Sequence, residues 1–97
     1  MKFLNELNLD EIIINDIIEH NGDAITTDLD SNYHNVKTNY ELLKYLGIKC
    51  FEQLLIYEID IFLIDTDVLK NSLEKINNIK DFIDNVNEDF FYIENLI

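Results

Sequence analysis

The residues whose types and spacing most clearly suggest a chemical role form a short acidic motif, Asp28-x-Asp30-x-Asn32. Carboxylate and amide oxygens at alternate positions are the first three ligands of a calcium-binding loop. Such a loop also needs a glycine at its sixth position and a bidentate glutamate at its twelfth. Those positions hold Tyr33 and Asn39. A turn rich in Asp and Asn is therefore favoured over a calcium site.

Two histidines and one cysteine are the remaining candidate ligands or nucleophiles. His20 and His34 could bind a transition metal together with Asp23 or Asp30, but they lack the paired spacing of a zinc site. Cys50 is the only cysteine and lies in an apolar stretch, so we predict a small core residue. We therefore predict no metal site, no cofactor and no catalytic residue, and we do not expect an enzyme.

A pair of carboxylates, Glu58 and Asp60, interrupts an otherwise apolar run. Two carboxylates in a cleft can act as general acid and base. On a helix, however, residues two apart do not face each other. We therefore predict that both lie at the solvent edge of this run and contribute to a contact surface.

The segment 90–93, Phe-Phe-Tyr-Ile, is an aromatic cluster between acidic residues. Core packing is the simpler interpretation of this cluster. The alternative is an exposed aromatic anchor with an acidic rim, which is the pattern of a binding hot spot. The sequence leaves both interpretations open.

The charge of the chain narrows the choice of partner. The 97 residues include 20 Asp and Glu against 7 Lys and no Arg, which gives a formal net charge of −13. Nucleic acids and anionic membranes bind through basic side chains, so direct binding to either is not expected. The acids concentrate in residues 1–30, 51–69 and 81–97, which together contain a single lysine. A basic protein is the natural complement.

The apolar periodicity predicts helices throughout most of the chain. The expected helices cover 9–20, 38–46, 51–64 and 67–76, with a further short helix from residue 79 and a last one from about residue 87. Asn8 and Thr38 are the expected N-caps, because each lies three residues before a glutamate. Gly22 and Gly47 are the expected stops. Residues 23–37 have no clear period and are predicted to form a long loop.

Residues 51–64 form the most apolar segment and are predicted to be the buried centre of the molecule. Alternating apolar residues are also compatible with a strand over 55–63, but fourteen residues exceed a usual strand. The predicted fold is all-α, a compact bundle of about five short helices in a single domain of residues 1–97. The alternative is an α+β fold with a short strand at 24–29 or 55–63.

The leading functional hypothesis is a non-enzymatic inhibitor that occupies the nucleic-acid-binding surface of a basic protein. Rows of acids on helices can present charge in the manner of duplex phosphates. Phage-encoded inhibitors of host defence nucleases, including anti-CRISPR and anti-restriction proteins, are often similar to this chain in size and acidity; the resemblance is one of size and charge. The expected partner-binding residues are Asp10, Asp16, Glu19, Asp23, Asp28, Asp30, Glu58, Asp60, Asp84, Glu88 and Asp89.

Two further classes of function remain open. One is an immunity protein or antitoxin that neutralises a cognate toxin, and the other is a calcium- or metal-binding regulatory protein. The sequence does not determine the oligomeric state, and a homodimer is one alternative. The N-terminus is acidic within six residues and no apolar run is long enough to span a bilayer. We therefore expect a cytoplasmic location in a bacterial host cell.

Overall fold

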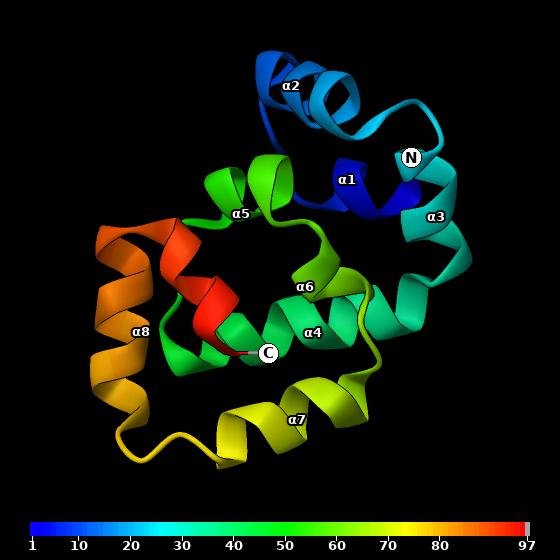
Figure 1. Ribbon diagram of the computed structural model, residues 1–97. Coiled ribbons are helices and arrows are strands. Elements are labelled where there is room, and N and C mark those ends of the chain that lie inside the picture. Colours follow the sequence, from blue (N-terminus) through cyan, green and yellow to red (C-terminus); the bar gives the residue numbers. More distant parts are fainter. Residues whose placement is uncertain (97) are drawn as a thin grey trace.

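All of the regular structure in residues 1–96, the part described by this computed structural model, is helical (Figure 1). The elements are α1 (Lys2–Glu6), α2 (Glu11–Asn21), α3 (Ile25–Ser31), α4 (Tyr33–Leu46), α5 (Phe51–Tyr57), α6 (Asp60–Leu63), α7 (Thr66–Glu74), α8 (Ile79–Glu88) and the 3-10 helix η1 (Phe90–Leu96). The predicted helical class is therefore confirmed. The nine elements of these residues exceed the predicted number of about five. The alternative strands at 24–29 and 55–63 are wrong, because both segments are largely helical.

The predicted loop at 23–37 is also wrong, because most of it forms α3 and the first turn of α4. Ile25 and Leu29 lie one turn apart on α3 and are both buried. This burial outweighs the weak helix propensity of the neighbouring Thr and Asp residues. Thr38 is an interior residue of α4 and not its N-cap, since its hydroxyl donates a hydrogen bond to the carbonyl of His34 at 2.7 Å.

The N-terminal helix boundaries differ from the prediction as well. Asn8 is not an N-cap: it has a φ of 54° in the linker before α2, and Asp10 occupies the N-cap position of that helix. The short helix α1 was missed because five residues are too few to establish a period. The predicted stops are confirmed, since Gly22 and Gly47 follow α2 and α4 with φ values of 91° and 107°.

The central run 51–64 is buried as predicted, but it is not one helix. Leu54, Leu55 and Phe62 have no exposed surface. The chain leaves the helical conformation at Glu58 and resumes it in the four-residue α6. Successive apolar residues point around all sides of a straight helix. A bend between α5 and α6 allows more of them to face the core.

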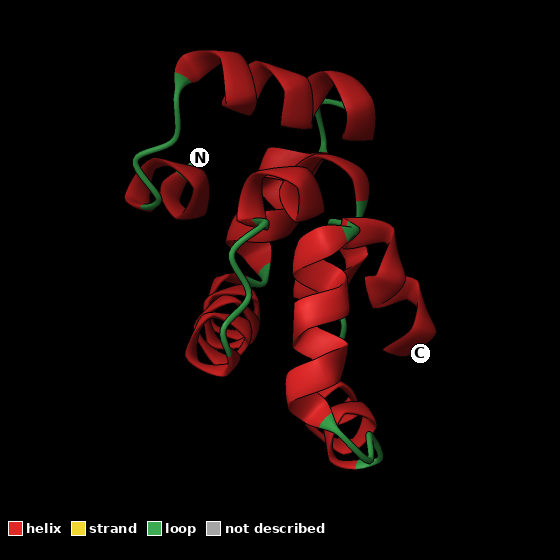
Figure 2. Ribbon diagram, turned by 90° about the vertical axis from the view of Figure 1, so that its left-hand side faces the viewer, coloured by secondary structure: helices red, strands yellow, loops and turns green. Residues whose placement is uncertain are grey.

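The other helices pack around this bent centre. α2 lies on α5, α4 lies against both α6 and α7, α1 contacts α3, and η1 folds back on α8 (Figures 1 and 2). The N-caps of α7 and α8 are Asp65 and Asn78, whose side chains accept hydrogen bonds from the Asp67 and Asp81 amides. The predicted last helix is the 3-10 helix η1.

Asparagine side chains hold several helix ends in place. Asn39 is fully buried on α4, and its amide donates to the carbonyls of Phe62 and Ile64 at 3.1 and 2.8 Å, at the C-terminal end of α6. Its oxygen accepts from the Thr66 hydroxyl at 2.8 Å, at the start of α7. Asn21 donates in the same way to the Ile56 carbonyl at 3.0 Å. These amides satisfy carbonyls that a helix end leaves without a partner.

Candidate protein-binding surface

The largest group of predicted site residues lies on α2, α3 and the turn between them. Five of the predicted acids are exposed there, namely Asp10, Asp16, Glu19, Asp23 and Asp28. Glu11, which the sequence prediction omitted, is a sixth exposed acid in the first turn of α2. α2 is anchored on α5 through the buried Ile17. No lysine or arginine occurs between Lys2 and Lys37. We call these six residues the acidic face.

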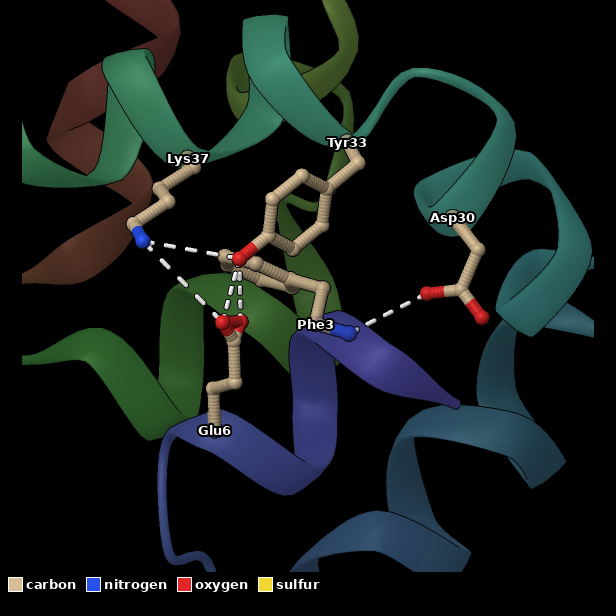
Figure 3. A network of polar contacts seen from close by, with 5 residues as sticks. All are labelled: Phe3, Glu6, Asp30, Tyr33 and Lys37. Atoms are coloured by element: carbon tan, nitrogen blue, oxygen red, sulfur yellow. Dashed lines mark hydrogen bonds and ion pairs between the residues drawn. The ribbon is translucent and has the colours of Figure 1, made fainter.

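Asp30 was predicted to belong to this surface, but its carboxylate makes contacts within the chain (Figure 3). It accepts hydrogen bonds from the Lys2 and Phe3 amides at 3.0 and 3.1 Å and lies 2.8 Å from the Met1 amine. The hydrogen bond from that amine is the main reason why the pKa of Asp30 is lowered. Asp30 therefore holds the start of α1 and is not grouped with the acidic face.

A second polar network fixes the other end of α1. The Tyr33 hydroxyl donates to the Glu6 carboxylate, and Lys37 approaches both groups (Figure 3). The Lys2 ammonium lies 4.1 Å from the centre of the Tyr33 ring, within the range of a cation–π contact. Two lysines of this acidic chain are thus used within the fold.

Glu58 and Asp60 line one cavity at a different place, where Asp60 is exposed and Glu58 is half-buried. The sequence predicts both at a solvent edge and not facing each other, and it does not identify their third partner. Both line a cavity of about 220 Å³ with Glu94 of η1, over a floor of isoleucines. Desolvation, hydrogen bonding with Glu94 and the negative charges of Glu94 and Asp60 raise the pKa of Glu58 to about 7. The sequence could not reveal this carboxyl pair, because its two members are 36 positions apart.

The predicted C-terminal acids, Asp84, Glu88 and Asp89, lie in two different environments. Asp84 lies on α8 beside a groove that Lys49 and Lys80 also line. Glu88 and Asp89 lie where α8 ends and η1 begins, and the Asp89 carboxylate accepts a hydrogen bond from the Phe91 amide at 3.1 Å. Glu88 and Asp89 therefore adjoin the aromatic segment, whereas Asp84 faces a mixed-charge groove.

The aromatic segment 90–93 combines both interpretations that the sequence left open. Ile93 is buried and Phe90 is half-buried, whereas Phe91 is 51% exposed. Tyr57 of α5 is 47% exposed and stacks on Phe90, with ring centres 5.3 Å apart and planes 18° from parallel. Phe91 lies 4.3 Å from Phe90 and 6.3 Å from Tyr57 by ring centres. We call Tyr57, Phe90 and Phe91 the aromatic patch.

The acidic face and the aromatic patch meet at a shallow recess. Its lining includes Asp16, Glu19 and His20 of α2 and Tyr57 of α5, and its volume is about 420 Å³. His20 packs edge-on against Tyr57, with ring centres 5.0 Å apart. Two carboxylates of the acidic face therefore line the same recess as Tyr57, the α5 member of the aromatic patch.

The candidate metal ligands are not brought together. Asp28 and Asp30 lie within α3, and His34 packs on Tyr33 in α4, away from the contact of His20 with Tyr57. In residues 1–96, no three His, Cys, Asp or Glu side chains are arranged to hold a metal ion. Cys50 is half-buried, and burial raises the pKa of its thiol.

None of the helices in the described part of the chain is both long enough and apolar enough to cross a membrane. Comparison of the chain with protein-family models, curated proteins and solved structures gave no match.

Proposed function

We propose that this protein is a small acidic, non-enzymatic inhibitor that binds a basic nucleic-acid-handling protein and occupies its nucleic-acid-binding surface. The observation that carries this proposal is the acidic face, where six exposed carboxylates occur within residues 10–28 and no lysine or arginine lies among them. A surface of one sign attracts a partner of the opposite sign and disfavours partners of its own sign.

The way in which the acidic face is anchored to the core favours a role in binding a basic protein. Four carboxylates of this face project from α2 and α3, which are anchored to the core through Ile17, Ile25 and Leu29. The other two lie at the N-cap of α2 and in the turn between the helices. Fixed charges lose less conformational entropy on binding than charges in a mobile loop. A basic groove that accepts duplex phosphates is complementary to such a group of exposed negative charges.

The proposed target is a nuclease or a CRISPR or restriction-type defence complex in a bacterial cell, and the proposed role is that of a phage anti-defence protein. Two properties support this narrower proposal. The chain is short, at 97 residues, and its net charge of −13 is large for that length. Electrostatic steering at this charge would allow fast capture of a basic target.

The test compares two variants with the same net charge. The first replaces Asp10, Asp16, Asp23 and Asp28 of the acidic face by Asn. The matched control replaces four exposed acids elsewhere, Glu41, Glu52, Asp67 and Glu74, by Gln or Asn. Each protein is immobilised and exposed to bacterial lysate at about 50 mM salt, and any captured protein is then assayed for DNA or RNA binding in a gel-shift experiment.

We expect the unmodified protein to capture a basic nucleic-acid-binding protein and to block its binding to nucleic acid. The face variant should lose most of this inhibition, whereas the control should retain it. Recovery of no such protein at low salt, or an equal loss in both variants, would contradict the proposal.

A further inference from the structure

The aromatic patch differs from the other exposed apolar residues of the described chain. Seven large apolar side chains are well exposed. Of these, Met1, Ile12, Tyr45 and Val68 belong to four different elements or segments, and Tyr92 packs on Phe82. Tyr57 and Phe91, by contrast, are in contact with each other and with Phe90. Single exposed apolar residues need no explanation, but a contiguous group often marks an interaction site.

The chain segments that supply the patch carry charges of one sign. Residues 51–69 and 81–96, which supply all three rings, contain no lysine or arginine. Asp16 and Glu19 line the recess beside Tyr57. The acids next to the rings along the chain are Glu58, Glu88 and Asp89. Charge complementarity therefore selects a cationic occupant for this patch.

We propose that the aromatic patch is the anchor of the interface, and that arginine side chains of a basic partner lie against its rings. This inference rests on the proposed function and names the contact that it would use. A guanidinium group is planar and weakly hydrated, so it can stack on an aromatic ring while its N–H groups donate to nearby carboxylates. A lysine ammonium is strongly hydrated and lacks the planar surface.

The acidic face and the aromatic patch then have different physical effects on binding. The exposed carboxylates mainly increase the rate of encounter, and their contribution is screened by salt. Rings that are covered by the partner are desolvated, and such residues usually dominate the lifetime of a complex. An interface with both features binds quickly and dissociates slowly.

The test uses two synthetic probes with the same charge, one peptide of six alternating Arg-Gly units and one of six alternating Lys-Gly units. Their affinities are measured by isothermal titration calorimetry at about 50 mM and 150 mM salt. Phe91→Ser removes an exposed ring of the patch without changing the net charge. The matched control is Tyr45→Ser, on α4, because Tyr45 is 87% exposed and lies outside the patch.

We expect the unmodified protein to bind the arginine peptide about tenfold more tightly than the lysine peptide, which is a hot-spot contribution of ordinary size. Phe91→Ser should remove this preference, and Tyr45→Ser should retain it. As a measurement that needs no variant, aromatic carbon–proton NMR of the unmodified protein should show the arginine peptide shifting the Phe91 and Tyr57 ring signals, with little change at Tyr45.

The outcomes separate this inference from the proposed function. Equal affinity for the two peptides, with the ring signals unmoved, overturns the anchoring role of the patch. If the four-Asn face variant still loses inhibition of the captured target in that case, the proposed function stands without the anchor. If no basic nucleic-acid-binding protein is captured at low salt while Phe91→Ser removes the arginine preference, the patch is an arginine site and the proposed function is wrong.

Discussion

Glu58 is the residue whose chemistry depends most on the fold. The sequence identified it as a carboxylate in an apolar run, but its neighbour Glu94 comes from η1 and could not be inferred from spacing. The same limit applies to Asp30, which has the sequence surroundings of a surface acid but holds the N-terminal amine. Residue type and local exposure could be predicted for most of the acids, whereas these long-range pairings could not.

The Glu58–Glu94 pair leads to a pH-dependent stability. The pKa of Glu58 is about 7 in the folded protein, above its usual value of 4.5, so between these values the folded state binds more protons than the unfolded chain. The contribution of this group is therefore complete below about pH 4.5 and is lost as the pH rises through about 7. We expect the midpoint of thermal unfolding to fall as the pH rises from about 6 to 8, with a smaller fall in Glu58→Gln.

The control for this prediction is Glu52→Gln, on the exposed side of α5. It removes one negative charge from the same helix but leaves the carboxyl pair intact. All other titratable groups are shared by the unmodified protein and Glu58→Gln, so the difference between the curves isolates Glu58. Identical pH dependence in the unmodified protein and Glu58→Gln would contradict the assignment.

At the scale of elements, the segment 23–46 shows why part of the helical structure was missed. Tyr33, Val36, Tyr40 and Leu43 repeat at helical spacing, so a signal for most of α4 was present in the sequence. The polar residues between them, including the buried Asn39, obscured it. An asparagine at a core position is read as a surface residue unless its partners are known, and those partners lie on α6 and α7.

Asn39→Ala should reveal how strongly this side chain joins the elements. It leaves the carbonyls at the end of α6 and the Thr66 hydroxyl with fewer partners in a buried place. An unsatisfied buried polar group costs about 1–3 kcal/mol. We expect the free energy of unfolding, measured by urea titration with circular dichroism, to fall by about that amount.

The matched control is Asn15→Ala, an exposed residue on α2 with no side-chain hydrogen bond to the described part of the chain. Alanine has the higher helix propensity, so this variant should be as stable as the unmodified protein or slightly more stable. A loss of stability in Asn39→Ala no greater than that in Asn15→Ala would mean that Asn39 does not clamp α6 to α7.

For the whole molecule, the helical class and the net charge follow from the sequence, because periodicity and composition are local properties. The arrangement of the elements does not follow. A run that is apolar on all sides, such as 51–64, can be packed against from any direction, so it does not specify which helix lies on which side. The placement of α2 on α5 and of η1 on α8 creates the surface where acids and rings meet.

The charge of the whole molecule leads to the last prediction, an increase of stability with salt. Only two ion pairs occur among residues 1–96, Met1–Asp30 and Lys37–Glu6, against a net charge of −13. The molecule measures 37 × 26 × 20 Å, so at low ionic strength, where the Debye length reaches about 30 Å, its charges repel one another across the whole structure. Sodium chloride at about 0.5 M should screen this repulsion and raise the midpoint of thermal unfolding above its value in about 10 mM salt. The variant with Asn at positions 10, 16, 23 and 28 should be more stable than the unmodified protein at low salt and should gain less from added salt. A midpoint that falls with salt in the unmodified protein would instead mean that attractive ion pairs dominate its electrostatics.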